Sequence, residues 1–187
     1  MRLSETDRHR IQAAVAEAEA RTGTHIATSI VPASDRYALY PLVWAALLAL
    51  LCGGALATLA RAMSLREGFA IEAAVFVALS LIYDWWPVRL RIVPPHTRHA
   101  RASAFAHREF AARILASRSE KGGVLLFVSL GERYAEVIGD RMLHARVGAE
   151  GWNRIVDALV AAAQSGHLAE GIVKAVETCA AEIQAHP

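Results

Sequence analysis

The sequence predicts an α/β fold, an α/β/α sandwich around a small mixed sheet that is interrupted by a two-helix transmembrane hairpin. Three observations support this prediction. Residues 41–60 contain no charged side chain, residues 24–31 and 124–130 have the composition of strands, and the remaining segments carry apolar residues at helical spacing. We therefore expect one soluble domain with a membrane insertion inside it.

The uncharged stretch at residues 41–60 makes up nearly all of the first predicted membrane span, which is expected at about residues 41–61. A helix rises about 1.5 Å per residue, so some twenty residues reach roughly the 30 Å of a bilayer's hydrocarbon core. A second span is expected at about residues 68–86. In this stretch Glu72 is the only charged residue before Asp84. The alternative for this second stretch is a buried core helix. Residues 61–67 between the spans are polar and too few to form a domain.

Aromatic residues flank the two predicted spans on what would be one face of the membrane. They are Tyr37, Tyr40, Trp44, Tyr83, Trp85 and Trp86. Tyrosine and tryptophan concentrate where a bilayer meets water, so this set predicts an interfacial aromatic belt.

Arginines predict which side of the membrane the termini face. Two arginines lie between the spans, and a larger group follows the second span without an intervening acid. The positive-inside rule then places both termini in the cytoplasm, in what we expect to be a bacterial inner membrane. Arg89, Arg91, Arg98 and Arg101 are expected to contact lipid headgroups. With a net charge of +2, no nucleic-acid partner is expected.

The soluble part begins with a predicted helix over residues 4–21. Ser4 and Asp7 have the spacing of a capping box, and Gly23 is a stop signal. A strand is expected at 24–31. After the membrane insertion, Pro94 and Pro95 precede a helix expected over residues 98–117.

The C-terminal part reads as a hairpin followed by two helices. Residues 124–130 form a continuous apolar run, which is typical of a strand buried on both faces. Gly131 and Glu132 predict a tight turn into an alternating strand at 133–138. Helices are expected over residues 149–165, ending at Gly166, and over residues 168–184.

A strand, a helix and a second strand in this order predict a parallel pair with a right-handed crossover. The membrane hairpin would then be inserted between the first strand and its crossover helix. The predicted divisions are residues 1–36 for the first part of the domain, residues 37–88 for the hairpin, and residues 97–187 for the remainder.

These residues resemble the TPM-domain family, most closely over residues 98–187 and more loosely over 4–31. The matching features are GGVLLFVSLGERYAEVIGDR at 122–141, Trp152-x-x-Ile155-Val156, the Gly166 turn, and Glu170-Gly171-Ile172. The resemblance implies an α/β/α sandwich, commonly tethered to a membrane. Some members resemble acid phosphatases of the thylakoid lumen with calcium binding, and another is a membrane accessory of a receptor channel. A pair of spans inside the domain departs from that pattern.

Asp140, Arg141 and His144 are the candidate catalytic residues for a phosphatase-like hydrolase. They follow a predicted strand at a helix start, where open α/β sheets often place ligands. Asp140 would ligate a metal or cap the helix, and Arg141 would bind phosphate or pair with Asp140. The sequence leaves open whether the protein is an enzyme.

Glu132, Glu136 and Asp140 are candidate metal ligands because they alternate along one ribbon. An exposed strand face explains the same alternation, and calcium requires six or more oxygens. The residues themselves predict no cofactor, whereas the family resemblance implies a divalent cation such as calcium.

The function favoured by the sequence is a membrane-anchored interaction or accessory module that works at the membrane surface. Its expected partners are membrane lipids and either a membrane protein or a second copy of the chain. The alternative is the phosphatase-like hydrolase centred on Asp140, Arg141 and His144.

Overall fold

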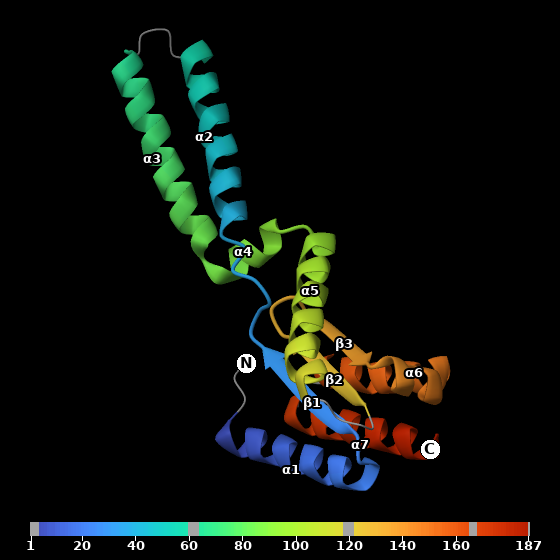
Figure 1. Ribbon diagram of the computed structural model, residues 1–187. Helices are drawn as coiled ribbons and strands as arrows, with labels where there is room; N and C mark the ends of the chain where they lie inside the picture. Colours follow the sequence, from blue (N-terminus) through green and yellow to red (C-terminus); the bar gives the residue numbers. More distant parts are fainter. Residues whose placement is uncertain (1–3, 60–63, 118–121, 165–167, 187) are drawn as a thin grey trace. The chain divides into compact units, whose positions relative to one another are not determined.

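The protein is described by a computed structural model that covers residues 4–59, 64–117, 122–164 and 168–186 (Figure 1). The chain divides into two compact units. The first consists of Met1–Ser34 together with His99–Pro187, and the second is Asp35–Arg98.

The first unit contains a mixed sheet, as expected. Its strands are β1 (His25–Val31), β2 (Gly123–Ser129) and β3 (Tyr134–Gly139), and in the described residues they lie in the order β1–β2–β3. Strand β2 pairs parallel to β1, with His25 opposite Gly123, and antiparallel to β3, with Leu125 opposite Ile138. Every residue of β2 is buried. The prediction of a central strand covered on both faces is therefore confirmed.

Helix α1 (Glu5–Thr22) begins and ends as its sequence predicts. Ser4 accepts a hydrogen bond from the backbone N–H of Asp7, and the Asp7 carboxylate accepts one from the Ser4 backbone, which completes a capping box. Gly23 follows with φ 67°, a left-handed conformation that suits glycine, and its N–H donates to the Glu19 carbonyl. The chain can then turn directly into β1.

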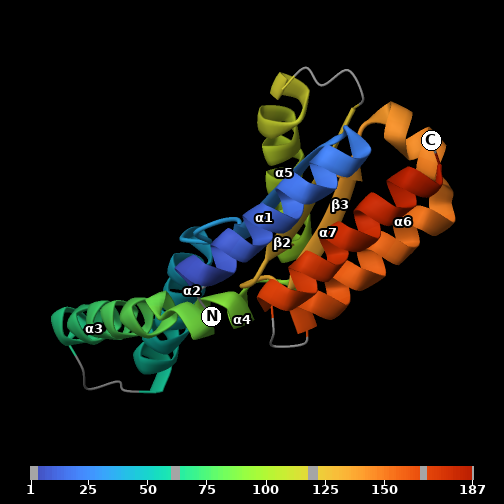
Figure 2. The ribbon, with the colours of Figure 1, turned by 90° about the horizontal axis from the view of Figure 1, so that it is seen from below.

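Helices α1, α6 (Arg141–Gln164) and α7 (Leu168–Ala185) cover one face of the sheet. Figure 2 shows α7 lying between α1 and α6. Their apolar side chains join Val124, Leu126 and Val128 of β2 in one core. Helix α6 is bent at Gly148, where φ is 70°, so its second part coincides with the helix predicted from residue 149. The predicted cap at Gly166 lies outside the described residues.

Helix α5 (Pro95–Arg113) packs on the opposite face of the sheet, and the 3-10 turn η1 (Leu115–Ser117) follows it. Ala102 and Ala106 are fully buried in a second core that includes Leu125 and Phe127 of β2. Alanine at these two positions lets the helix approach the sheet closely. Helix α5 thus serves as the crossover between β1 and β2.

The second unit contains α2 (Leu39–Leu59), α3 (Leu65–Asp84) and the short α4 (Trp86–Ile92). Helices α2 and α3 lie side by side (Figure 1). Pro41, Ala45 and Ala49 are the buried residues of α2. Helix α4 was not predicted from the sequence. It begins directly after α3, and the ring of Pro87 suits the first turn of a helix.

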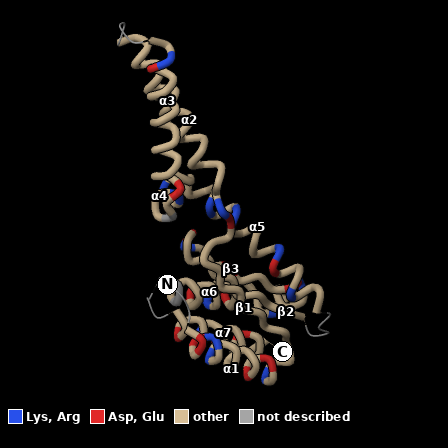
Figure 3. The backbone as a smooth tube through the Cα atoms, turned by 90° about the vertical axis from the view of Figure 1, so that its left-hand side faces the viewer, with Lys and Arg blue, Asp and Glu red and all other residues tan. Residues whose placement is uncertain are grey.

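Within the described residues, α2 is the one helix long and apolar enough to cross a membrane. Figure 3 shows it without a charged residue along its length. Helix α3 is less apolar because it carries Arg66 and Glu67 in its first turn, Glu72 farther along and Asp84 at its end. The second span predicted at residues 68–86 therefore has a helix at its position, but that helix does not meet the same composition test.

The burial of Cys179 gives a prediction for the thiol chemistry of the fold. Its side chain in α7 is fully buried, and burial raises the pKa of the thiol to about 12. Since the thiolate is the reactive form, we expect Cys179 to resist a maleimide at pH 8 until the protein unfolds. Cys52 is exposed on α2, so the measurement is made in a Cys52→Ser variant. Rapid labelling of the folded variant would contradict this packing of α7.

Candidate functional site

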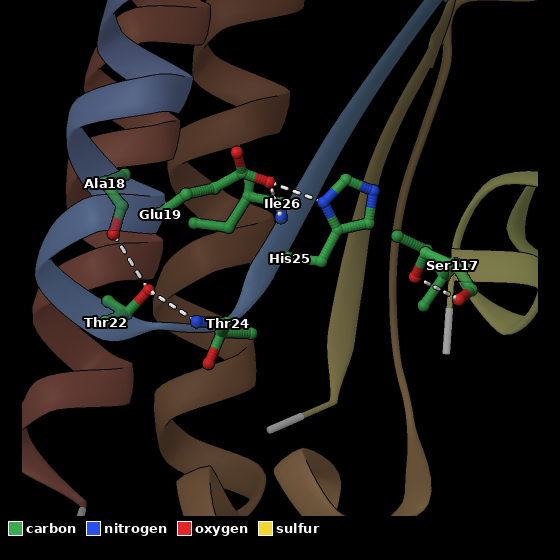
Figure 4. Close-up of polar contacts among 8 residues, drawn as sticks. Ala18, Glu19, Thr22, Thr24, His25, Ile26 and Ser117 are labelled. Atoms are coloured by element: carbon green, nitrogen blue, oxygen red, sulfur yellow. Dashed lines mark hydrogen bonds and ion pairs between the residues drawn. The ribbon is translucent and has the colours of Figure 1, made fainter. Parts of the chain in front are cut away.

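A polar pocket lies at the amino-terminal end of β1. Its volume is about 310 Å³, and it is lined by Glu19, Gly23, Thr24, His25 and Ser117. Three elements contribute to it, because Glu19 belongs to the last turn of α1, His25 begins β1, and Ser117 ends η1. The left-handed turn at Gly23 reverses the chain and brings the side chains of Glu19 and His25 together (Figure 4).

Glu19 and His25 form the central contact of the pocket. The distance from His25 Nδ1 to Glu19 Oε1 is 2.6 Å, and the same carboxylate oxygen accepts the backbone N–H of Ile26 at 2.8 Å. Both side chains are about one-third exposed, at 37% for His25 and 33% for Glu19. The carboxylate thus fixes the orientation of the imidazole and leaves its other nitrogen, Nε2, on the side away from Glu19 (Figure 4).

The same contact has a structural role at the edge of the sheet. Because the His25 N–H donates to the carbonyl of Gly122, the residue before β2, the N–H of Ile26 points to the outer edge of β1, where Glu19 accepts it. The Thr28 carbonyl accepts a hydrogen bond from Arg113 Nη1 at 3.3 Å. Side chains therefore form hydrogen bonds with backbone N–H and C=O groups on the outer edge of β1, which would otherwise be open to pairing with another strand.

Two threonines lie beside the pocket, at the turn between α1 and β1. Thr22 Oγ1 donates to the Ala18 carbonyl at 2.8 Å and accepts the Thr24 N–H at 3.2 Å. Thr24 is 1% exposed, and its hydroxyl has no hydrogen-bond partner among the described residues. Across the pocket, Ser117 Oγ donates to the Ile114 carbonyl at 2.7 Å.

Asp140, a predicted catalytic residue, has both carboxylate oxygens engaged by the backbone. Its Oδ1 accepts the N–H of Leu143 at 2.9 Å, and its Oδ2 accepts the N–H of Gly123 at 3.0 Å. The first bond caps α6, and the second joins the start of that helix to β2. Gly122, with φ 82°, lies against the same carboxylate, since a Cβ there would overlap Asp140 Oδ2. The helix-cap alternative accounts for this residue.

Arg141 and His144 do not converge on Asp140. Both are exposed. The imidazole of His144 stacks on Trp152 with ring centroids 5.6 Å apart. The described residues thus show none of the hydrogen bonds between these three side chains that a nucleophile and its base would make.

The explanation of Glu132 as part of an exposed acidic strand face is wrong, because its side chain is buried. Glu132 is 2% exposed. It accepts hydrogen bonds from the Ser34 N–H at 2.9 Å, from the Ser34 hydroxyl at 2.7 Å and from the Ser129 hydroxyl. It belongs to the turn before β3, so strand alternation does not place it on the face of Glu136, whose carboxylate accepts a hydrogen bond from Tyr134. Among the described residues, no group of three potential metal ligands is present.

The predicted headgroup arginines have different environments. Arg89 is held within the second unit, where it pairs with Asp84 and donates to the Arg36 carbonyl at 2.9 Å. Arg91 and Arg101 are exposed, and Arg98 is half-buried. The structure therefore gives Arg89 a role in joining α4 to the end of α3.

The predicted interface aromatics also divide. Trp85 and Trp44 are 68% and 45% exposed, whereas Tyr37 is buried. Tyr40 and Tyr83 are half-buried. The side chain of Trp86 lies outside the described set. An interfacial aromatic belt remains a prediction. Tyr37 is not part of it, because its side chain is buried.

Sequence reasoning missed the pocket residues Glu19, His25 and Ser117. The first two are six residues apart across a helix end, and Ser117 is distant in the chain. The local signal was Gly23, which marks the reversal that brings Glu19 to the first residue of the strand. The position of Ser117 follows from the packing of α5 and could not be read from spacing.

Comparison with known proteins identifies a family. The family model described as TPM domain matches residues 87–182, just over half of the chain. The NMR structure of BA42 protein from the psychrophilic bacteria Bizionia argentinensis sp. nov. is similar in fold, with a TM-score of 0.55 and 13% sequence identity. That similarity covers 100% of this chain and 84% of the other. A search of curated proteins found no match.

The geometry of Asp140 predicts a structural role that mutation can test. Replacing Asp140 with alanine removes the α6 cap and the acceptor of Gly123 N–H, which should lower the free energy of unfolding by about 1–3 kcal/mol. Arg141→Ala, an exposed neighbour, should change it by less than about 0.5 kcal/mol. Denaturant unfolding of both variants measures the difference. Equal stability of Asp140→Ala and the unmodified protein would contradict the assignment.

Proposed function

Because the chain belongs to the TPM domain family, we propose that it is a TPM domain anchored in a membrane, where it acts as an interaction or accessory module at the membrane surface. The anchor is the helix pair α2 and α3, and the module is the sandwich formed by the first unit. The observation that carries the proposal is the exposure of large apolar side chains along both helices.

These exposed side chains argue against a soluble core helix. Leu50, Leu51 and Leu59 of α2 are 62%, 68% and 84% exposed, and Phe69 and Leu81 of α3 exceed 70%. Soluble monomers rarely leave so many large apolar groups together at the surface. A lipid bilayer would cover them, and α2 has the length and composition to cross it.

The contact between α2 and α3 also supports a membrane setting. The side of α2 that is buried presents Ala45 and Ala49, and Gly53 follows at the same four-residue spacing. Helices in bilayers commonly associate through such small residues, because the backbones can then approach closely. The larger leucines of α2 are left on the outside, toward lipid.

Helix α3 is proposed as the second span, with its acid turned inward. A Cβ added at Gly53 would lie 2.7 Å from Glu72 Oε2, so the Glu72 side chain lies against α2. The exposed apolar residues of α3, among them Val77 and Leu81, would face lipid. An acid inside a membrane helix pair is expensive unless it is sheltered from the hydrocarbon, and the space at Gly53 provides that shelter.

The end of the helix pair where α2 begins and α3 ends is proposed to lie at the cytoplasmic surface of a bacterial inner membrane. Trp44 and Trp85 belong to this end, as does the exposed Arg91 of α4. Tryptophan suits the interface, and arginine is attracted to anionic headgroups. Both termini would then be cytoplasmic. The proposed partners are membrane lipids and a membrane protein or a second copy of the chain.

No observation supports the hydrolase alternative as strongly as the exposed apolar side chains of α2 and α3 support the anchor. It requires Asp140 to ligate a metal or to act on substrate, and both oxygens of Asp140 already accept backbone N–H groups. The interaction module is therefore the better-supported function.

Membrane insertion predicts a specific response to charge on α2. The double substitution Leu47→Arg and Leu50→Arg places two cations on exposed positions near the middle of the helix, and each should cost about 2.5–3.5 kcal/mol of insertion free energy. We expect the unmodified protein to stay in membranes after alkaline carbonate extraction and the variant to be released. The control is Leu115→Arg, which changes an exposed leucine of the first unit and should leave the protein in the membrane fraction.

Release of the unmodified protein by carbonate would contradict the anchor. Retention of the double variant at the level of the Leu115→Arg control would contradict the assignment of α2 as the span.

A further inference from the structure

Strand β3 forms the second edge of the sheet, and its outward backbone groups are open. Because the Asp140 N–H donates to the Gly123 carbonyl, every second residue of β3 counted back from Asp140 faces β2. The residues between them turn their backbone N–H and C=O groups away from the sheet, and these residues are Ala135, Val137 and Gly139. None of these outward groups forms a hydrogen bond with a residue that the structure describes.

The two edges of the sheet differ in how they are protected. On β1, Glu19 accepts the outward N–H of Ile26, and Arg113 donates to the outward carbonyl of Thr28. In the described parts of the chain, no side chain does the same on β3. Proteins usually protect their edge strands, and an unprotected edge is the surface to which an extended peptide is added as a further strand. Strand β3 therefore has the backbone groups of a peptide-docking edge.

The charges at the two ends of β3 indicate which peptide suits this edge. Arg133 precedes the strand and Arg141 follows it after Asp140. Both arginines are exposed, and neither forms an ion pair with a described residue. The two acids between them are already engaged, since Glu136 accepts the Tyr134 hydroxyl at 3.0 Å and Asp140 accepts backbone N–H groups. An added strand would pass a cation at each end, in either direction.

We propose that the outer edge of β3 binds an extended peptide segment of a partner protein that carries an acidic residue near each end. The outward groups of Ala135, Val137 and Gly139 would pair with the peptide backbone, and the two acids would pair with Arg133 and Arg141. A strand that reaches from one arginine to the other has about nine residues, at roughly 3.3 Å per residue.

A second copy of the chain suits the edge less well. The antiparallel two-fold pairing that uses all the outward groups of β3 centres on Val137 and sets Ala135 opposite Gly139 of the second copy. The same register places Arg133 opposite Arg141 of the second copy at both ends. Like charges directly opposite each other destabilise a strand pair. A peptide with acids at these positions replaces that repulsion with attraction.

This inference rests on the proposed interaction module and gives that module a surface and a class of partner. Its residues all belong to the first unit, so binding at the edge does not require the membrane anchor. Carbonate extraction tests the anchor and peptide binding tests the edge. Each can therefore fail without the other.

The test uses the full-length, detergent-solubilised protein and the peptide Glu-Thr-Val-Thr-Val-Thr-Val-Thr-Glu, with fluorescein at its amino end and an amide at its carboxyl end. Fluorescence anisotropy should show saturable binding. The double variant Arg133→Glu with Arg141→Glu should bind about tenfold more weakly or worse, because both attractions become repulsions. The matched control reverses two exposed arginines of α1, Arg8→Glu with Arg21→Glu. It has the same net charge and should bind as the unmodified protein does.

The control peptide has the same sequence with an N-methyl group on every internal residue. It keeps both acids but loses the N–H donors that would pair with β3, so it should not bind. Hydrogen exchange gives a second measurement. The unmodified peptide should slow exchange in Tyr134–Gly139 and leave His25–Val31 unchanged, because the β1 edge already has side-chain partners.

Four outcomes overturn the proposal. They are no saturable binding of the unmodified peptide, equal binding of the N-methylated peptide, unweakened binding in the Arg133→Glu and Arg141→Glu variant, and slow exchange of Tyr134–Gly139 that appears without peptide as the protein concentration rises. The last outcome would show a second copy on the edge. Protection of Cys179 from maleimide in a Cys52→Ser background shows that each variant is folded.

Discussion

The burial of β2 is the constraint on which the rest of the structure depends. All seven residues of this strand are buried, so both faces need helices and both edges need strands. Helices α1, α6 and α7 cover one face and α5 covers the other, while β1 and β3 supply the paired edges. Because β1 pairs parallel to β2, the chain must leave the sheet and return to the same end before β2 begins. Residues 32–122 make that excursion, and the apolar helix pair lies within it.

The matched family region, residues 87–182, omits α1 and β1. Without β1, one edge of the fully buried β2 would have no strand, and without α1 part of the larger core would be uncovered. The N-terminal 34 residues therefore belong to the same compact unit as the matched region. They also supply Glu19, Gly23, Thr24 and His25 to the lining of the pocket beside β1. An anchor inserted at this point would leave the domain's sheet pairing unbroken while attaching it through two chain connections.

Sequence could predict those features that rest on local chemistry. The capping box at Ser4, the stop at Gly23 and the apolar run of β2 each depend on neighbouring residues, and the structure contains all three. Features that depend on tertiary packing could not be predicted from the sequence. Glu132 lies in the turn predicted for it, but the alternation with Glu136 that suggested an exposed strand face is broken by Arg133, whose φ is 52°. The Glu132 carboxylate is buried, and it accepts hydrogen bonds from the Ser34 N–H, the Ser34 hydroxyl and the Ser129 hydroxyl. Glu19 and His25 meet because a left-handed glycine folds the chain back. Ser117 joins them through tertiary packing.

Strand β1 is an integral strand of the domain, and it pairs with β2 although the helix pair separates the two in the sequence. Hydrogen exchange of the full-length protein, read by mass spectrometry on peptides from β1 and β2, measures this pairing. We expect slow exchange in His25–Val31, of the same order as in Gly123–Ser129, because the two strands share one ladder and open together. Fast exchange in His25–Val31 while Gly123–Ser129 stays protected would contradict it.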